Sequence, residues 1–66
     1  MDLELLKIKR KQKGMTQQDM ADFFSYTRQN FNQKELGKQL FKLSEIKELM
    51  SMLELTPEEV IKIFIE

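Results

Sequence analysis

The chain has 66 residues, no cysteine, no histidine, and equal numbers of basic and acidic residues, 11 of each. Without cysteine it forms neither a disulfide framework nor a thiolate metal site, and without histidine a zinc site would need carboxylates alone. No apolar run approaches the roughly 18 residues of a membrane span, and the first residues do not resemble a signal peptide. We therefore expect one soluble, cytoplasmic domain over residues 1–66, near the lower size limit for a single core.

An enzyme is not expected, because the chain offers no histidine, no cysteine and no convergent acid/base pair, and it has too little mass to enclose a pocket. No cofactor and no small-molecule substrate are therefore expected. The charges are unevenly spread: residues 1–42 hold nine basic against five acidic residues, and residues 43–66 hold two against six. Such a dipolar molecule could present a basic face to phosphates, although solvated helix surfaces would give the same pattern.

The first predicted helix runs from about residue 3 to 13. Asp2 is a suitable N-cap, and Gly14 suits the left-handed position that follows a helix end. The apolar residues of this segment are crowded near its start, so the pattern does not define which face is buried.

A second, short helix is predicted over residues 17–24. Thr16 can accept a hydrogen bond from the backbone of Asp19, and the Asp19 side chain can return the bond, which makes a capping box. Residues 25–27 then break the helical period.

The third predicted helix covers residues 28–36 and ends before Gly37. Phe31 is its one large apolar residue up to position 35, and most of its other side chains are hydrogen-bonding groups. Two short helices joined by a tight turn, the second nearly all polar, are typical of a helix-turn-helix that binds DNA.

Two further helices are predicted, one over residues 43–53 and one starting at Pro57. The last helix has the strongest start in the chain, because Thr56 can cap it and Glu59 can close the box. The helix over 43–53 has apolar residues at helical spacing, namely Leu43, Ile46, Leu49, Met50 and Leu53.

The C-terminal segment is too apolar for one helix face. We expect Val60, Ile61 and Phe64 to face the core, which leaves Ile63 and Ile65 without a place. These two isoleucines are the candidate dimer contact, because a small DNA-binding domain needs a second, symmetric copy to bind a DNA site that consists of two half-sites. They could also be frayed and without a role.

The spacing of these residues resembles the Cro/phage-repressor helix-turn-helix family over nearly the whole chain. The shared register is Arg10-x-x-x-Gly14-Met15-Thr16-Gln17-x-x-Met20-Ala21-x-x-Phe24, then Thr27-Arg28-Gln29-x-Phe31, then Glu35-x-Gly37. The resemblance implies an all-α, compact, five-helix lambda-repressor-like domain whose second and third helices form the helix-turn-helix. It also implies a double-stranded DNA operator of pseudo-palindromic sequence, bound by a homodimer. A short transcriptional repressor of a phage or mobile element is the function that follows.

The resemblance places four side chains of the third helix toward the major groove, and their chemistry suits base edges. These candidate base contacts are Arg28, Gln29, Asn32 and Gln33. Polar residues on a helix are usually only solvated, but asparagine and glutamine so close together are an unusual choice for a merely solvated helix. The candidate phosphate contacts are Gln17, Lys34, Lys38 and Lys42.

In this family Arg10 and Glu35 commonly form a structural ion pair, and we expect that role here in preference to a DNA contact by Arg10. The basic cluster over residues 9–13 could reach phosphates, but an exposed face of the first helix would look the same. The alanine at position 21 fits the close approach of the two motif helices, where a larger side chain would push them apart.

Three residues depart from the family pattern. Ser25 stands where the turn usually has glycine, and a left-handed serine there costs about 1 kcal/mol. Lys34 replaces an aliphatic residue, so its stem is expected to cover the core while its ammonium escapes toward a phosphate. Phe23 occupies a normally polar position and either packs on Tyr26 or anchors a protein partner.

The rival class is a protein-binding helical module, such as an antirepressor or an antitoxin-like partner. It would keep the same fold and bind protein through Phe23 and the apolar C-terminal residues. The two classes differ in salt dependence, because a complex held by phosphate contacts loses affinity steeply as salt rises.

Overall fold

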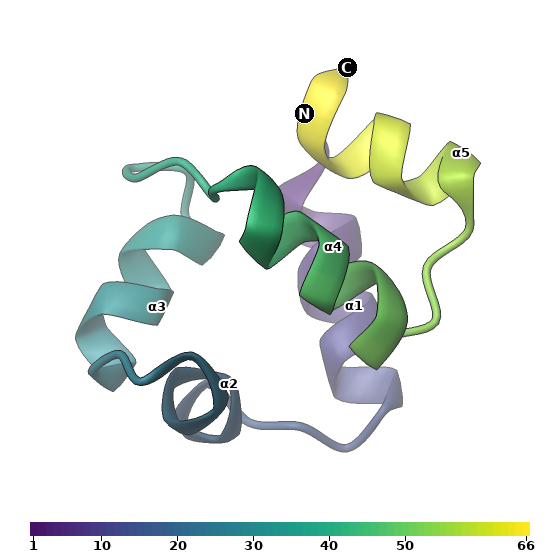
Figure 1. The fold of residues 1–66 in the computed structure, drawn as a ribbon. Helices are drawn as coiled ribbons and strands as arrows, with labels where there is room; N and C mark the ends of the chain where they lie inside the picture. The colour runs from purple at the N-terminus through teal and green to yellow at the C-terminus, as the bar shows by residue number, and fades with distance from the viewer.

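The computed structural model describes residues 1–66, which form five helices and no strand. The helices are α1 (Leu3–Gln12), α2 (Gln17–Phe24), α3 (Arg28–Glu35), α4 (Leu43–Met52) and α5 (Pro57–Val60), and α5 continues directly into a π-helical turn, η1 (Ile61–Ile65). The expected bounds of the second and third helices agree with α2 and α3 to within one residue. α3 and α5 lie at opposite ends of the molecule (Figure 1).

Threonine caps define the starts of three helices. Thr16, Thr27 and Thr56 each accept a hydrogen bond from the backbone N–H three residues later, at 3.0 to 3.2 Å. Each threonine has extended backbone angles, so it ends the preceding loop and satisfies a donor that the first helical turn leaves unpaired. The capping box expected between Thr16 and Asp19 is present. Local sequence therefore accounts for where these helices begin.

The connection between α2 and α3 turns through a left-handed residue. Ser25 has φ +61° and ψ +38°, the conformation that glycine adopts most easily. The N–H of Tyr26 then donates to the carbonyl of Ala21 at 2.8 Å, which closes the end of α2. Ala21 is fully buried, as the close approach of the two helices requires.

The hydrophobic core lies between α1, α2, α3, α4 and the C-terminal turn. Its eight buried residues are Leu6, Met20, Ala21, Phe31, Leu49, Leu53, Leu55 and Ile63. Phe31 is the only apolar side chain that α3 contributes to this buried set, which agrees with its place as the one large apolar residue of that helix. Burying one such side chain contributes about 1.5–3 kcal/mol.

The expectation for the C-terminal residues is wrong for Ile63. Its side chain is fully buried, whereas Ile65 is 71% exposed and Ile61 is exposed as well. The core-facing positions are 60, 63 and 64, which is a helix face as regular as the expected 60, 61 and 64. Periodicity could not distinguish the two faces, because apolar residues occupy both.

Contact with the start of α1 determines which of the two faces of the C-terminal segment is buried. The backbone N–H of Asp2 donates to the carbonyls of Lys62 and Ile63 at 3.0 and 3.2 Å, and α1 packs against η1. The two chain ends are therefore side by side (Figure 1). Ile63 is a core residue and is withdrawn as a dimer contact.

One residue of the expected apolar face of α4 also lies outside the hydrophobic core. Leu43 is exposed, while Leu49 and Leu53 are fully buried and Ile46 and Met50 are half-buried. Lys42 is the N-cap of α4, and its N–H donates to the Glu45 carboxylate at 2.7 Å. Because Leu43 is the first residue of the helix, it sits at the rim of the core rather than over it.

Candidate functional site

The outward face of α3 is polar. Arg28 and Gln29 are exposed at its first turn, and Asn32 and Gln33 are half-buried one turn later. The structure therefore keeps all four expected base-contact residues on or near the surface of one helix. Arg28, the only charged residue of the four, forms no ion pair.

A polar hollow opens where the start of α2 meets the start of α3. It is lined by Gln17, Arg28, Gln29 and Asn32, with no apolar residue among them. A hollow without apolar lining is unsuited to a drug-like organic ligand, which needs mostly apolar walls. Its groups are hydrogen-bonding groups of the kind that pair with base edges.

A buried ion pair contacts one of the residues that line this hollow, Gln17. The Nε of Arg10 donates to one carboxylate oxygen of Glu35 at 2.8 Å, and Nη2 donates to the other at 3.1 Å. The third nitrogen, Nη1, donates to the carbonyl of Met15 at 2.7 Å. Both side chains are almost fully buried. The expected Arg10–Glu35 pair is thus present and joins α1, α3 and the loop before α2.

The pair extends to the hollow through an amide. The Nε2 of Gln17 donates to Glu35 Oε1 and to Asn32 Oδ1, both at 2.9 Å. This corrects the expectation for Gln17, since both side-chain N–H groups have protein acceptors and no side-chain donor is left for a phosphate. Gln17, which is itself one of the lining residues, instead links Asn32 to Glu35.

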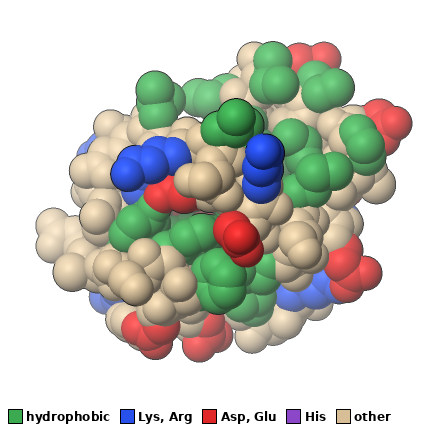
Figure 2. Space-filling model, viewed as in Figure 1, with side chains coloured by type: hydrophobic (Ala, Val, Ile, Leu, Met, Phe, Trp, Pro, Cys, Tyr) green, Lys and Arg blue, Asp and Glu red, His purple; other side chains and the backbone are tan.

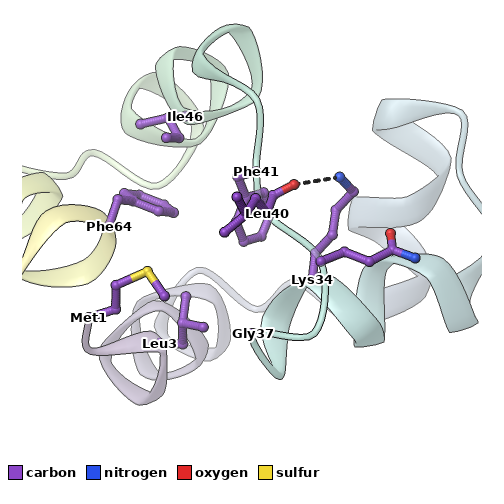
Figure 3. Close-up of a pocket in the computed structure, with 9 residues that line it drawn as sticks. Met1, Leu3, Lys34, Gly37, Leu40, Phe41, Ile46 and Phe64 are labelled. Carbon is purple, nitrogen blue, oxygen red and sulfur yellow. Dashed lines mark hydrogen bonds between the residues drawn. The ribbon is translucent and has the colours of Figure 1, made fainter.

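The expectation for Lys34 is also wrong. The side chain is only 7% exposed, and its ammonium donates to the Leu40 carbonyl at 3.1 Å and contacts Glu45 at 3.4 Å. It also lies over two aromatic rings, 5.1 Å from the centroid of Tyr26 and 5.8 Å from that of Phe41. The carbonyl contact is visible in Figure 3. The ammonium finds enough partners inside the protein, so it does not reach out toward a phosphate.

Burial lowers the pKa of Lys34, and the nearby Lys42 ammonium lowers this pKa further. The single contact to Glu45, at 3.4 Å, does not offset these effects. Lys38 and Lys42, in the connection between α3 and α4, are exposed and form no ion pair. These two remain the lysines with ammonium groups available for a phosphate on this side of the molecule.

The basic cluster of α1 is partly neutralised by acidic residues from the C-terminal half. Lys9 forms an ion pair with Glu59 at 2.9 Å, and Lys13 pairs with Glu54. The hydrogen bond from Lys13 lowers the pKa of Glu54, and the bonds from the Thr56 backbone and then from Lys9 lower the pKa of Glu59. Basic residues of α1 therefore lie next to acidic residues of the C-terminal half in space, although the two groups are separated in sequence.

Sequence reasoning missed an apolar hollow between the chain ends and the α3–α4 connection. Met1, Leu3, Phe41, Ile46 and Phe64 line it together with Leu40, which is 77% exposed. Figure 3 shows these side chains around the hollow, and Figure 2 shows apolar side chains gathered over the upper part of the same view as Figure 1. Leu40 was the available signal, since it is a large apolar residue in the connection between two predicted helices.

Phe23 is 53% exposed and packs edge-on against Phe24, with ring centroids 5.1 Å apart, while Phe24 stacks on Tyr26. No group of three or more acidic residues lies together in a way that could hold a metal ion. No helix has the length and apolar character needed to cross a membrane. Comparisons with protein-family models, with curated proteins and with solved structures found no match.

Proposed function

We propose that this protein is a sequence-specific DNA-binding transcriptional regulator of the lambda-repressor-like type, with α3 placed in the major groove of an operator. The observation that carries the proposal is the outward face of α3. Arg28, Gln29 and Asn32 meet there around a hollow that contains no apolar side chain. Arginine pairs with guanine O6 and N7, and the amides pair with acceptors and donors of base edges.

The arrangement of α2 and α3 supports the same proposal. Both helices have eight residues, and three residues join them. Ala21 and Phe31 are fully buried in α2 and α3, so the two helices are held as one unit while the polar side of α3 stays accessible. A second helix held in this way can enter a major groove, which is wide enough for one helix.

Exposed lysines near the end of α3 would supply phosphate contacts. Lys38 and Lys42 lie in the connection between α3 and α4, and phosphate contacts orient a reading helix without specifying sequence. The chain has no net charge, so such contacts alone would give weak, unspecific binding. Specificity in this proposal therefore depends on the residues of α3.

The test is selection of bound duplexes from a random double-stranded DNA library, followed by titration of the enriched and a scrambled sequence. Arg28→Ala should cost about 1–3 kcal/mol on the enriched sequence and little on the scrambled one. Lys38→Ala should weaken binding to both by a similar factor, and Lys62→Ala, on η1 away from α3, is the control. Selection that enriches no sequence, or equal losses for Arg28→Ala on both duplexes, would overturn the proposal.

Two copies on a pseudo-palindromic operator are part of this proposal. One helix reads only a few base pairs, and a second copy makes the second contact effectively intramolecular. Of the two isoleucines expected to form a homodimer contact, Ile65 is exposed and stays a candidate. Ile65→Glu should leave the melting temperature unchanged and weaken binding to a full operator but not to a half-site; unchanged cooperativity in a gel-shift titration would exclude this contact.

The apolar hollow beside Leu40 and the exposed Phe23 favour a second candidate, a module that binds protein rather than DNA. Salt separates the two candidates. A complex led by phosphate contacts weakens steeply between low and moderate salt, whereas apolar contacts change little.

A further inference from the structure

We infer that Asn32 is held with its amide N–H donors toward the DNA, so that it prefers guanine over adenine. The inference rests on the proposed function. It follows from the direction of the hydrogen bonds that run from Arg10 through Glu35 and Gln17 to Asn32.

The first step is the fixed acceptor. An arginine guanidinium has only donors, and an ionised carboxylate has only acceptors. Arg10 holds Glu35 through two bonds, at 2.8 and 3.1 Å, in a nearly dry environment. Glu35 can therefore offer only acceptor oxygens to its next neighbour.

The second step is the orientation of the Gln17 amide. A glutamine amide has an acceptor oxygen at one end and two N–H donors at the other. Because Glu35 only accepts, Gln17 must turn its nitrogen toward it, and the observed distance from Nε2 to Oε1 is 2.9 Å. The same nitrogen lies 2.9 Å from Asn32, so the group that Asn32 offers must be its oxygen.

The third step concerns the other end of Asn32. With its oxygen engaged by Gln17, Asn32 has its two N–H donors left for the polar hollow that it shares with Arg28. Pairing with adenine would require the same oxygen to accept a second hydrogen bond, from the adenine N6, in addition to the one from Gln17. Guanine offers two acceptors in the major groove, which suits a group that only donates. Arg28 also only donates, so both side chains favour the same edge.

The DNA experiment changes the free end of Asn32 and leaves the held end an acceptor. Asn32→Asp keeps an oxygen for Gln17 but replaces the outward N–H donors with a second acceptor. Library selection with wild type should enrich a guanine at one position of each half-site, and selection with Asn32→Asp should lose that guanine. On the wild-type sequence the variant should bind about tenfold more weakly.

Gln12→Glu, at the exposed end of α1, adds the same negative charge away from the hollow. It should weaken all sequences alike and keep the guanine. Replacing that guanine by 7-deazaguanine, which lacks the N7 acceptor, should weaken wild type and not Asn32→Asp. An adenine at the position that depends on Asn32, or a base preference that Asn32→Asp leaves unchanged, would overturn the inference while leaving DNA binding intact. No enriched sequence at all would instead overturn the proposed function.

A measurement on the free protein tests the hydrogen-bond direction without DNA. In side-chain amide NMR spectra, the Gln17 NH₂ protons should exchange slowly with water, and the Asn32 NH₂ protons should exchange quickly. Glu35→Gln should speed the Gln17 exchange, because the fixed acceptor is lost. Slow exchange at Asn32 together with fast exchange at Gln17 would show the opposite direction and overturn the inference.

Discussion

Two adjacent residues of α3 form buried ion pairs with two different helices, and the two pairs are built differently. Glu35 receives two bonds from Arg10 on the α1 side, at 2.8 and 3.1 Å. Lys34 makes one contact of 3.4 Å with Glu45 on the α4 side, and its shorter bond, 3.1 Å, goes to a backbone carbonyl. The first pair is a fork that fixes both partners, and the second is a point charge that shares several weaker partners.

The difference assigns a separate task to each pair. The Arg10–Glu35 pair leads through Gln17 to the polar hollow, so it orients side chains proposed to read bases. The Lys34–Glu45 pair holds the connection to α4, because Lys34 bonds Leu40 and Glu45 bonds the N–H of Lys42. One pair therefore supports the polar face of α3, and the other positions the loop that carries the exposed lysines.

The largest expected effect comes from breaking the arginine pair. Arg10→Met leaves Glu35 buried with only the Gln17 amide as a partner, and removing one partner of such a pair costs about 3–5 kcal/mol. A domain of this size has little more than that in total, so urea or thermal unfolding should show a largely unfolded protein. Lys9→Met breaks a partly exposed pair with Glu59 and should cost less than about 1 kcal/mol. Equal melting temperatures for the two variants would show that the buried Arg10–Glu35 pair contributes no more to stability than the Lys9–Glu59 pair.

The lysine pair should be far less sensitive. Lys34→Met loses the ammonium that lies over the Tyr26 and Phe41 rings, but it removes the cost of burying a charge and leaves Glu45 bonded to the Lys42 N–H. Buried ion pairs replaced by apolar groups of similar volume are often neutral, so we expect a change within about 1.5 kcal/mol in either direction. A loss as large as that of Arg10→Met would show that the two pairs are equivalent after all.

Salt dependence of DNA binding separates the buried lysine from an exposed one. Lys38→Ala should reduce the slope of log K against log salt by about 1, because one phosphate contact is lost. Lys34→Met should leave the slope unchanged, because its ammonium is held by Leu40 and Glu45. A reduced slope in Lys34→Met would show that the ammonium leaves the interior when DNA binds.

The smallest expected effect is on the pH dependence of stability. Burial, and then Lys42, lower the pKa of Lys34 in the folded protein below its ordinary value. Below the folded-state pKa of Lys34, the free-energy cost of burying its charged ammonium is fully present. As the pH rises from that pKa toward the ordinary pKa of lysine, this cost is relieved, because the unfolded chain then binds more protons than the folded protein. The stability of wild type relative to Lys34→Met should therefore rise in alkaline solution. A relative stability that falls there would mean that Glu45 dominates and raises the pKa.

Sequence reasoning was most accurate where the signals were local. Thr16 and Thr56 were expected to cap helices and do so, because a hydroxyl and a backbone N–H three residues later suffice for a cap. The Arg10–Glu35 pair was expected from a register and not from local chemistry. The polar face of α3 was expected from the same register, and whether it binds DNA stays a prediction.

The failures have a common physical cause, which is dependence on distant partners. Lys34 stays inside because Leu40 and Glu45 are folded next to it, and nothing in the residues around position 34 shows that arrangement. Gln17 turns inward because it donates to Glu35, which Arg10 already holds. Glu35 is 18 residues away in sequence, so the residues around position 17 do not show this contact. Ile63 is buried because η1 lies against α1, whereas the apolar pattern fits two faces equally well.

The bonds between the two chain ends have a consequence for synthesis. Asp2 donates to carbonyls at positions 62 and 63, and the side chain of Ile63 completes the core. A nascent chain that has not yet exposed these residues can form caps and short helices, but it cannot close the core. Such contacts at high sequence separation form late. Folding of this domain on the ribosome should therefore wait for nearly all of the sequence to emerge, and a chain stopped before Ile63 should remain sensitive to protease.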